Sequence, residues 1–255
     1  MKKWERVARS FIDSCSFKDD IEAVFLTGSH VFGNADEFSD IDLYIILSDS
    51  VDWRERGNKR VDGMLIEYFA NPMRQVKKYI DDSYANVRLI EINMILGGNI
   101  IFDKNSAADK AIAYCKEKLS EDFPEMSEFS IKTGLYLLWD CLDELKRSHS
   151  MDSSDFTMQY FRFVQSAFEL YSRYVCSPVP NYHKLYRWLN DEEYFNRYGL
   201  VAHKDPEFVA LVRSAFTCED NATMFGMAEG LYEYVAGKMG GMDIGNFVLR
   251  GGCEI

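Results

Sequence analysis

The stretch TGSHVFGNADEFSDIDL, residues 27–43, contains the pattern that decides the fold of the N-terminal part of the chain. An apolar run leads into Gly28-Ser29, and a polar loop with a second glycine follows it. The loop ends at Asp40 and Asp42, which are one residue apart and run directly into another apolar segment. Because both apolar segments have the length and composition of short strands, we expect two carboxylates at the mouth of a buried strand.

The two aspartates are spaced to act together. Side chains alternate along a strand, so Asp40 and Asp42 point to one side, while Ile41 between them points into a core. Two like charges this close are costly unless a cation lies between them. Mg²⁺ is the obvious cation, because it takes oxygen ligands at about 2.0–2.1 Å and favours one or two carboxylates together with substrate phosphates.

A third carboxylate is supplied by Glu67, within the apolar segment MLIEYF. A glutamate in such surroundings is rarely left buried without a partner. If the strand that carries Glu67 lies beside the strand that follows Asp40, three carboxylates converge at one edge of the sheet. We therefore predict that Asp40, Asp42 and Glu67 hold one or two Mg²⁺ ions.

The Gly-Ser turn supplies groups that suit a phosphate. Gly28 permits a close backbone approach, and the hydroxyl of Ser29 and nearby N–H groups can bind phosphate oxygens. Ser39, directly before the first aspartate, adds another hydroxyl. A phosphate cradle beside metal-binding carboxylates predicts phosphoryl or nucleotidyl transfer, in which catalysis depends on positioning and charge neutralisation.

Apolar spacing along the rest of the chain predicts a mixed α/β region followed by helices alone. In the first region, strands are expected at 21–28, 41–47, 60–70 and 97–103, and helices at 3–16, 72–83, 85–96 and 106–119. Asn71-Pro72 resembles an N-cap followed by proline at the first helical position. In the second region, helices are expected within 127–149, 155–175, 181–195, 206–216 and 221–239.

This change in pattern predicts an α+β protein with two domains. Residues 1–122 are expected to form the catalytic domain, a mixed sheet with helices, and residues 123–255 an all-helical domain. Ligand clefts often form between domains, so the substrate cleft is expected between these two.

Composition excludes several classes of protein. Asp and Glu outnumber Lys and Arg by 41 to 29, which gives a formal charge of −12 and disfavours nucleic acid as a partner. The same charge would attract cationic small molecules, although plain solubility also explains it. The six scattered cysteines form no CxxC pair, as expected of reduced thiols in a cytoplasmic protein. No apolar run reaches the length of a membrane span.

The whole constellation resembles the polymerase-beta-type nucleotidyltransferase superfamily, and most closely the antibiotic nucleotidyltransferases that modify aminoglycosides or lincosamides. The matching residues are Gly28, Ser29, Asp40, Asp42 and Glu67. The resemblance covers about residues 20–105 and is architectural beyond them. It implies that the aspartate pair binds Mg²⁺ and that the third acid is a metal ligand, the general base for an acceptor hydroxyl, or both. It also implies a helical C-terminal domain and a possible role in antibiotic resistance.

The resemblance points less sharply to residues of the helical region. In the aminoglycoside enzymes a lysine in a similar helix reaches the nucleotide phosphates, and Lys184 resembles it in placement. Arg162 and Arg187 are alternatives, and all three also fit ordinary surface cations. Further candidates are His30 for the nucleotide pocket, Glu91 as a base, and Asp140, Asp143 and Glu144 as an acidic wall for a cationic acceptor. Each of them also fits an ordinary loop or solvated helix residue.

The sequence therefore predicts an Mg²⁺-dependent, adenylyltransferase-type enzyme. It would transfer a nucleoside monophosphate, AMP from ATP or the equivalent from another NTP, to a hydroxyl of a small molecule. The acceptor would be an aminoglycoside, a lincosamide or a metabolite. The alternative is an antitoxin-like or regulatory protein of the same fold that binds or modifies a protein partner, although such proteins are short single-domain chains. Nucleic-acid tailing ranks last, because no basic cluster with interleaved aromatics is present.

Overall fold

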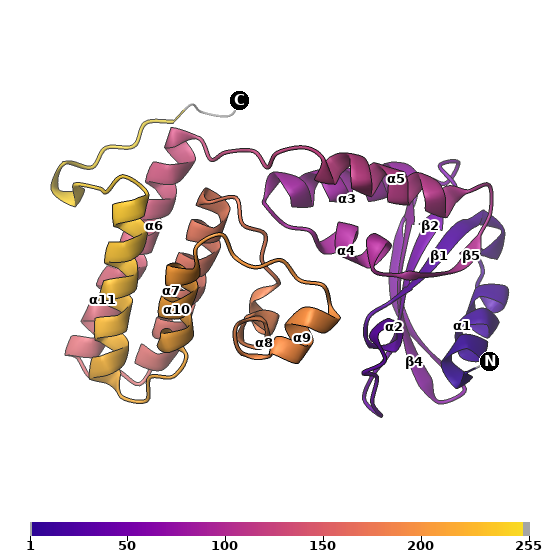
Figure 1. The fold of residues 1–255 in the computed structure, drawn as a ribbon, viewed down its shortest axis with the longest axis horizontal. Helices are drawn as coiled ribbons and strands as arrows, with labels where there is room; N and C mark the ends of the chain where they lie inside the picture. Colours follow the sequence, from indigo (N-terminus) through magenta and orange to yellow (C-terminus); the bar gives the residue numbers. More distant parts are fainter. Residues whose placement is uncertain (1, 252–255) are drawn as a thin grey trace. The chain divides into compact units, whose positions relative to one another are not determined.

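The computed structural model of the chain describes residues 2–251 (Figure 1). The chain divides into two compact units, Met1–Phe123 and Pro124–Ile255. The buried apolar residues form two clusters in the N-terminal unit and one in the C-terminal unit. Within residues 2–251, every helix falls short of the length or the apolar character that crossing a membrane requires.

The N-terminal unit is built on a five-stranded mixed sheet. Its strands are β1 (Ile21–Thr27), β2 (Ile41–Leu47), β3 (Glu55–Val61), β4 (Met64–Pro72) and β5 (Asn99–Asp103). They lie in the order β3-β4-β2-β1-β5, with β2 and β4 parallel and the other neighbouring pairs antiparallel. β1 and β2 are buried along nearly their whole length, because apolar residues occupy both of their faces and helices cover both sides of the sheet.

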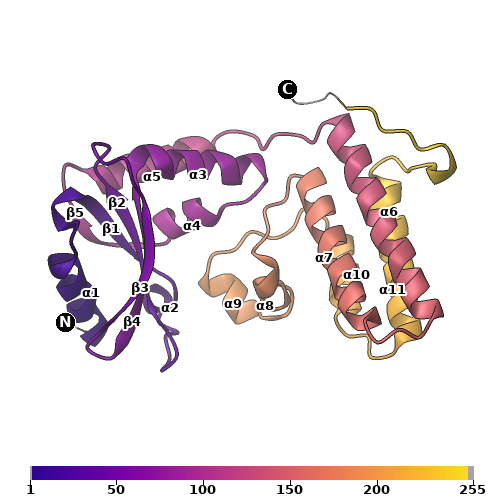
Figure 2. The same ribbon diagram turned by 180° about the vertical axis from the view of Figure 1, so that it is seen from behind.

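Helices cover the two faces of this sheet unequally (Figures 1 and 2). The helices are α1 (Lys3–Ser14), α2 (Ser29–Phe32), α3 (Met73–Ala85), α4 (Ile90–Leu96) and α5 (Ala107–Leu119), with a short 3-10 turn, η1 (Lys18–Asp20). One face packs on α1 through Val7 and Phe11. The other face packs on α3, α4 and α5, with Phe25 and Tyr44 among the strand residues buried there.

The strand expected at residues 60–70 is in fact part of a hairpin. β3 and β4 are joined by Asp62-Gly63, whose φ angles of 48° and 80° form a tight turn. The prediction missed most of β3 because this edge strand is polar and exposed, and therefore lacks an apolar alternation. Charged residues along an edge strand are a common protection against unwanted pairing.

Two helix predictions in this unit were wrong in their boundaries. Pro72 ends β4 and occupies the N-cap of α3 with extended backbone angles, so it is not at the first helical position. Asn71 is a buried residue of β4. The helix expected at 85–96 begins only at Ile90, because α3 continues to Ala85 and Val87 then adopts a positive φ of 55°.

All regular secondary structure in the described residues of the C-terminal unit is helical, as expected. Its helices are α6 (Glu128–Ser150), α7 (Phe156–Tyr174), α8 (Leu185–Asn190), α9 (Glu192–Arg197), α10 (Pro206–Ala215) and α11 (Asn221–Lys238), with 3-10 turns η2 (Tyr182–Lys184) and η3 (Ile244–Asn246). The segment 181–195 forms η2, α8 and α9 instead of one helix. The break falls at Asp191, whose side chain accepts a hydrogen bond from the Tyr194 amide and caps α9.

Candidate metal and nucleotide site

The three predicted carboxylates lie together at one end of the sheet. Asp42 in β2 is the register partner of Glu67 in the parallel strand β4, and Asp40 immediately precedes β2. One oxygen from each of the three side chains lies within 4.8 Å of the others. All three residues are half-buried. The expectation that the strand bearing Glu67 neighbours the aspartate strand is therefore confirmed.

This cluster suits a hard divalent cation. It offers only carboxylate oxygens, which are the ligands that Mg²⁺ prefers, and no histidine or cysteine that would favour zinc. Its partial exposure leaves room for water and substrate oxygens to complete the coordination. The residues present therefore fit the metal that the sequence predicted.

Gly28 fits closely against one of these carboxylates. Its backbone has φ 70° and ψ −156°, a conformation that is almost restricted to glycine. A Cβ atom at this position would lie 1.9 Å from Oδ2 of Asp42. The glycine is therefore required both by the backbone turn and by the carboxylate beside it.

The segment after Gly28 forms one short helical turn. Ser29 opens α2, a single helical turn that ends at Gly33 with φ 75°. The Asn34 amide then donates a hydrogen bond to the Ser29 carbonyl at 3.3 Å. Gly28 and Ser29 thus lie where β1 ends beside β2, since Thr27 is the register partner of Asp42.

The loop before Asp40 is held by its own hydrogen bonds. The Ser39 hydroxyl donates to the Asp36 carboxylate at 2.9 Å and accepts from the Asp36 amide at 2.9 Å. The hydrogen bond from Ser39 is the main reason that the pKa of Asp36 is lowered. Ser39 therefore orders the loop that leads into the site, and its contact with a phosphate stays a prediction.

Arg56 is a member of this site that the sequence analysis missed. Its Nη2 atom lies 2.8 Å from Oε1 of Glu67, and its guanidinium lies 4.4 Å from the centroid of the Phe69 ring. It comes from β3, where Asn58 is the register partner of Glu67, so Arg56 reaches the glutamate diagonally across the hairpin. The Asp62-Gly63 turn signal would have revealed this pairing.

His30 is half-buried and lies near Asp40. Burial lowers the pKa of its imidazole, and the negative charge of Asp40 opposes that effect. Its Nε2 atom is buried without a hydrogen-bond partner among the described residues, and its ring lies 5.9 Å from that of Trp4. A role for His30 in lining a nucleotide pocket stays a prediction.

Glu91 lies outside the carboxylate cluster. It belongs to α4 and accepts a hydrogen bond from the Ser83 hydroxyl at 2.6 Å. Burial raises the pKa of Tyr44, and the charge of Glu91 adds to that effect, so this carboxylate lies near the buried phenol. These contacts account for the position of Glu91, and a role for it as a base stays a prediction.

The cationic candidates of the C-terminal unit lie on η2, α7 and α8. Lys184 is exposed and ends η2 directly before α8. Arg187 lies on α8 over the Tyr194 ring, 5.7 Å from its centroid, and Arg162 lies on α7. Contacts of these cations with a nucleotide stay predictions.

The acidic face of α6 is partly ion-paired. Arg147 lies 3.3 Å from Asp143 and 3.5 Å from Glu144, one helical turn away, whereas Asp140 is exposed. These i,i+3 and i,i+4 pairs are typical of a solvated helix surface. The structure therefore favours the simpler interpretation of this face over an acidic wall for a cationic acceptor.

Comparison with known proteins identifies the domain that contains the carboxylates. Residues 8–91 match the family model of the nucleotidyltransferase domain. The matched range contains Gly28, all three carboxylates and Arg56. The mixed sheet with its flanking helices is accordingly a nucleotidyltransferase fold, as predicted.

A nucleotidyltransferase-like protein from Exiguobacterium sibiricum 255-15 is similar to the chain, with 12% sequence identity and a TM-score of 0.49. The similarity covers 91% of this chain and 74% of that protein. No curated protein matches the chain.

Proposed function

We propose that this chain is an Mg²⁺-dependent nucleotidyltransferase that transfers a nucleoside monophosphate, AMP from ATP, to a hydroxyl group of a small molecule. The observation that carries the proposal is the convergence of Asp40, Asp42 and Glu67 within 4.8 Å at the end of two neighbouring strands. This cluster lies inside the segment that matches the nucleotidyltransferase domain.

In this proposal, Asp40 and Asp42 hold the metal and Glu67 completes the site. A bound Mg²⁺ would supply Lewis-acid stabilisation of the charge that develops on the phosphate oxygens. The acceptor oxygen forms a bond to the α-phosphorus of the nucleotide, and the bond to pyrophosphate breaks. Glu67 is the group placed to take the proton that the hydroxyl loses.

Arg56 gives Glu67 a second partner whose effect is electrostatic. An arginine 2.8 Å away stabilises the charged carboxylate and reduces the repulsion from the two aspartates. Because the guanidinium of Arg56 is largely exposed, it can move when a substrate or metal binds. Arg56 thus pairs with Glu67 until a metal ion or substrate displaces it.

The phosphate groups are assigned to the Gly-Ser turn and to cations. The backbone around Gly28, the Ser29 and Ser39 hydroxyls and the Lys184 ammonium are the groups we propose to contact the triphosphate. The formal charge of −12 favours a cationic acceptor such as an aminoglycoside, while a lincosamide or another metabolite is also compatible.

A mass-spectrometric transfer assay tests the proposal. Purified protein, Mg²⁺ and each of the four NTPs would be incubated with panels of aminoglycosides, lincosamides and hydroxylated metabolites. We expect an acceptor heavier by one nucleoside monophosphate, together with released pyrophosphate, and loss of both with Asp42→Asn. Undiminished transfer by Asp42→Asn would exclude the metal role of this residue, and absence of Mg²⁺-dependent nucleotide binding would overturn the proposed function.

A further inference from the structure

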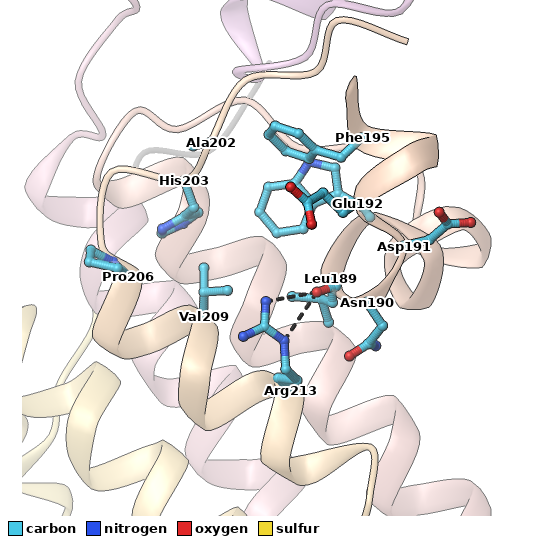
Figure 3. A pocket seen from close by; sticks show the side chains of 11 residues that line it. Leu189, Asn190, Asp191, Glu192, Phe195, Ala202, His203, Pro206, Val209 and Arg213 are labelled. Carbon is cyan, nitrogen blue, oxygen red and sulfur yellow. Dashed lines mark hydrogen bonds between the residues drawn. The ribbon is translucent and has the colours of Figure 1, made fainter. Parts of the chain in front are cut away.

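The helical unit contains a pocket bordered by α8, α9 and α10 (Figure 3). Its volume is about 550 Å³, within the range of about 300–1,000 Å³ that is typical of small-molecule sites. The side chains that decide its chemistry are Trp188, Glu192, Phe195, His203, Val209 and Arg213. None of them belongs to the carboxylate cluster of the N-terminal unit.

Aromatic rings form a fixed part of the pocket wall. Trp188 is buried, and its ring packs edge-on against Phe168 at a centroid distance of 6.0 Å. Phe195 lies 6.1 Å from the Trp188 ring and is half-buried. Figure 3 shows Val209 and Pro206 across the pocket from Phe195. Apolar surfaces on both sides favour a ligand with a flat or apolar body.

Glu192 is the acidic group directed toward this space. Figure 3 shows its carboxylate beside Phe195, whereas the side chain of Asp191 points away. Asp191 is used as the cap of α9, and Glu193 is paired with Arg197. The side chain of Glu192 is exposed, and the side-chain hydrogen bonds and ion pairs of α9 within residues 2–251 belong to its neighbours and not to Glu192. Its carboxylate is therefore available to a ligand.

Among the described residues, neither basic side chain of the pocket forms an ion pair with Glu192. Arg213 donates from Nε and Nη2 to the Leu189 carbonyl, at 3.1 and 2.7 Å, which fixes its guanidinium in the pocket wall. Nδ1 of His203 accepts a hydrogen bond from the Asp205 amide at 3.0 Å. Burial lowers the pKa of His203, so this imidazole is neutral at physiological pH.

We infer that this pocket binds an organic ammonium ion that carries an aromatic ring, with the ring against Trp188 and Phe195 and the ammonium group at Glu192. An aromatic wall attracts a cation through its ring faces, and a carboxylate adds a charge-assisted hydrogen bond. The inference assigns a ligand site to the helical unit and does not depend on nucleotidyl transfer.

Three matched probes test the inference on the full chain by isothermal titration calorimetry. Tryptamine carries the ring and the ammonium group, tryptophol replaces the amine by a neutral hydroxyl, and indole-3-propionate replaces it by a carboxylate. We expect tryptamine to bind about tenfold more tightly than tryptophol, the difference that one charge-assisted hydrogen bond supplies, and indole-3-propionate to bind most weakly. Equal affinities, or no binding of tryptamine, would overturn the inference.

Two neighbouring glutamates provide a matched pair of variants. Glu192→Gln should remove the preference for tryptamine over tryptophol, whereas Glu193→Gln, with the same charge change in the same turn of α9, should keep it. A preference that survives Glu192→Gln, or that both variants lose equally, would show that the pocket carboxylate is not the binding group. The preference of the unmodified chain decides the question if a variant is unstable.

Discussion

Replacing Gly28 by alanine should disable the carboxylate site, whereas the same replacement at Gly33 should leave it intact. Both glycines have a positive φ, 70° and 75°, and they flank the short helix α2. At Gly33 an added Cβ meets no atom within 4 Å, but at Gly28 it lies 1.9 Å from Oδ2 of Asp42. Real Cβ atoms do not approach other atoms closer than 3.0 Å, so the Asp42 carboxylate would have to withdraw by about 1 Å.

The size of both effects follows from these geometries. A non-glycine residue in the conformation of Gly28 costs about 1–3 kcal/mol, and one in the left-handed conformation of Gly33 costs about 1–2 kcal/mol. Both variants should therefore lose similar amounts of unfolding free energy. The displaced carboxylate in Gly28→Ala should also weaken metal binding by about 10–100-fold, the range that follows when a residue orienting a metal ligand is lost.

Urea unfolding and Mn²⁺ titration followed by electron paramagnetic resonance measure the two quantities separately. We expect Gly33→Ala to be destabilised but to bind Mn²⁺ like the unmodified chain. If Gly28→Ala retained full Mn²⁺ affinity, the contact with Asp42 would not set the geometry of the site. Equal loss of affinity in both variants would mean that the turn as a whole, and not the single contact, positions the carboxylate.

Two further predictions concern charges. Arg56→Gln should tighten Mn²⁺ binding about two- to fivefold, because the exposed ion pair between Arg56 and Glu67, worth up to about 1 kcal/mol, no longer competes with the metal. The control Arg60→Gln, on the same strand, should change the affinity little. A weaker Mn²⁺ affinity in Arg56→Gln would contradict this. Asp205→Ala should lower the free energy of unfolding by about 1–3 kcal/mol at neutral pH, since the side chain caps α10 and accepts a hydrogen bond from Tyr171 at 2.6 Å. Burial raises the pKa of Asp205, but its hydrogen bonds outweigh that effect and leave the pKa lowered. The stabilisation by Asp205 should therefore be complete above the ordinary aspartate pKa and disappear as the pH falls through the lowered value. Urea unfolding from pH 7 down to pH 2 checks this, and a stability difference between the variant and the unmodified chain that is independent of pH would contradict it.

The carboxylate cluster was predictable because strand alternation and one neighbour relation determine it. Asp40 and Asp42 were placed on one side of β2 by the two-residue period, and the apolar surroundings of Glu67 indicated a partner. Arg56 was missed because it lies on β3, which is polar and exposed. Such a strand has no alternation of apolar residues by which the sequence could reveal it. A contact from an edge strand becomes predictable only once the hairpin turn is recognised.

The helical unit shows a different limit of sequence reasoning. Segment 181–195 has apolar residues at helical spacing, yet the Asp191 side chain caps a new helix and divides the segment. The pocket is lined by residues on several helices, Trp188 and Arg213 among them. The spacing of apolar residues in the sequence does not specify how these helices pack together. Local capping chemistry and tertiary packing, and not the apolar period, thus create the site around Glu192.

The separate cores have a consequence for how this protein can evolve. Within residues 2–251, the core built around α7 shares no residue with either core of the sheet. A substitution that reshapes the wall around Trp188 therefore acts on a different core from those that support the strand of Asp42, and the free-energy effects of changes that share no packing partner are expected to add. Selection can thus alter what the helical unit recognises in steps, without readjusting the sheet that presents the carboxylates.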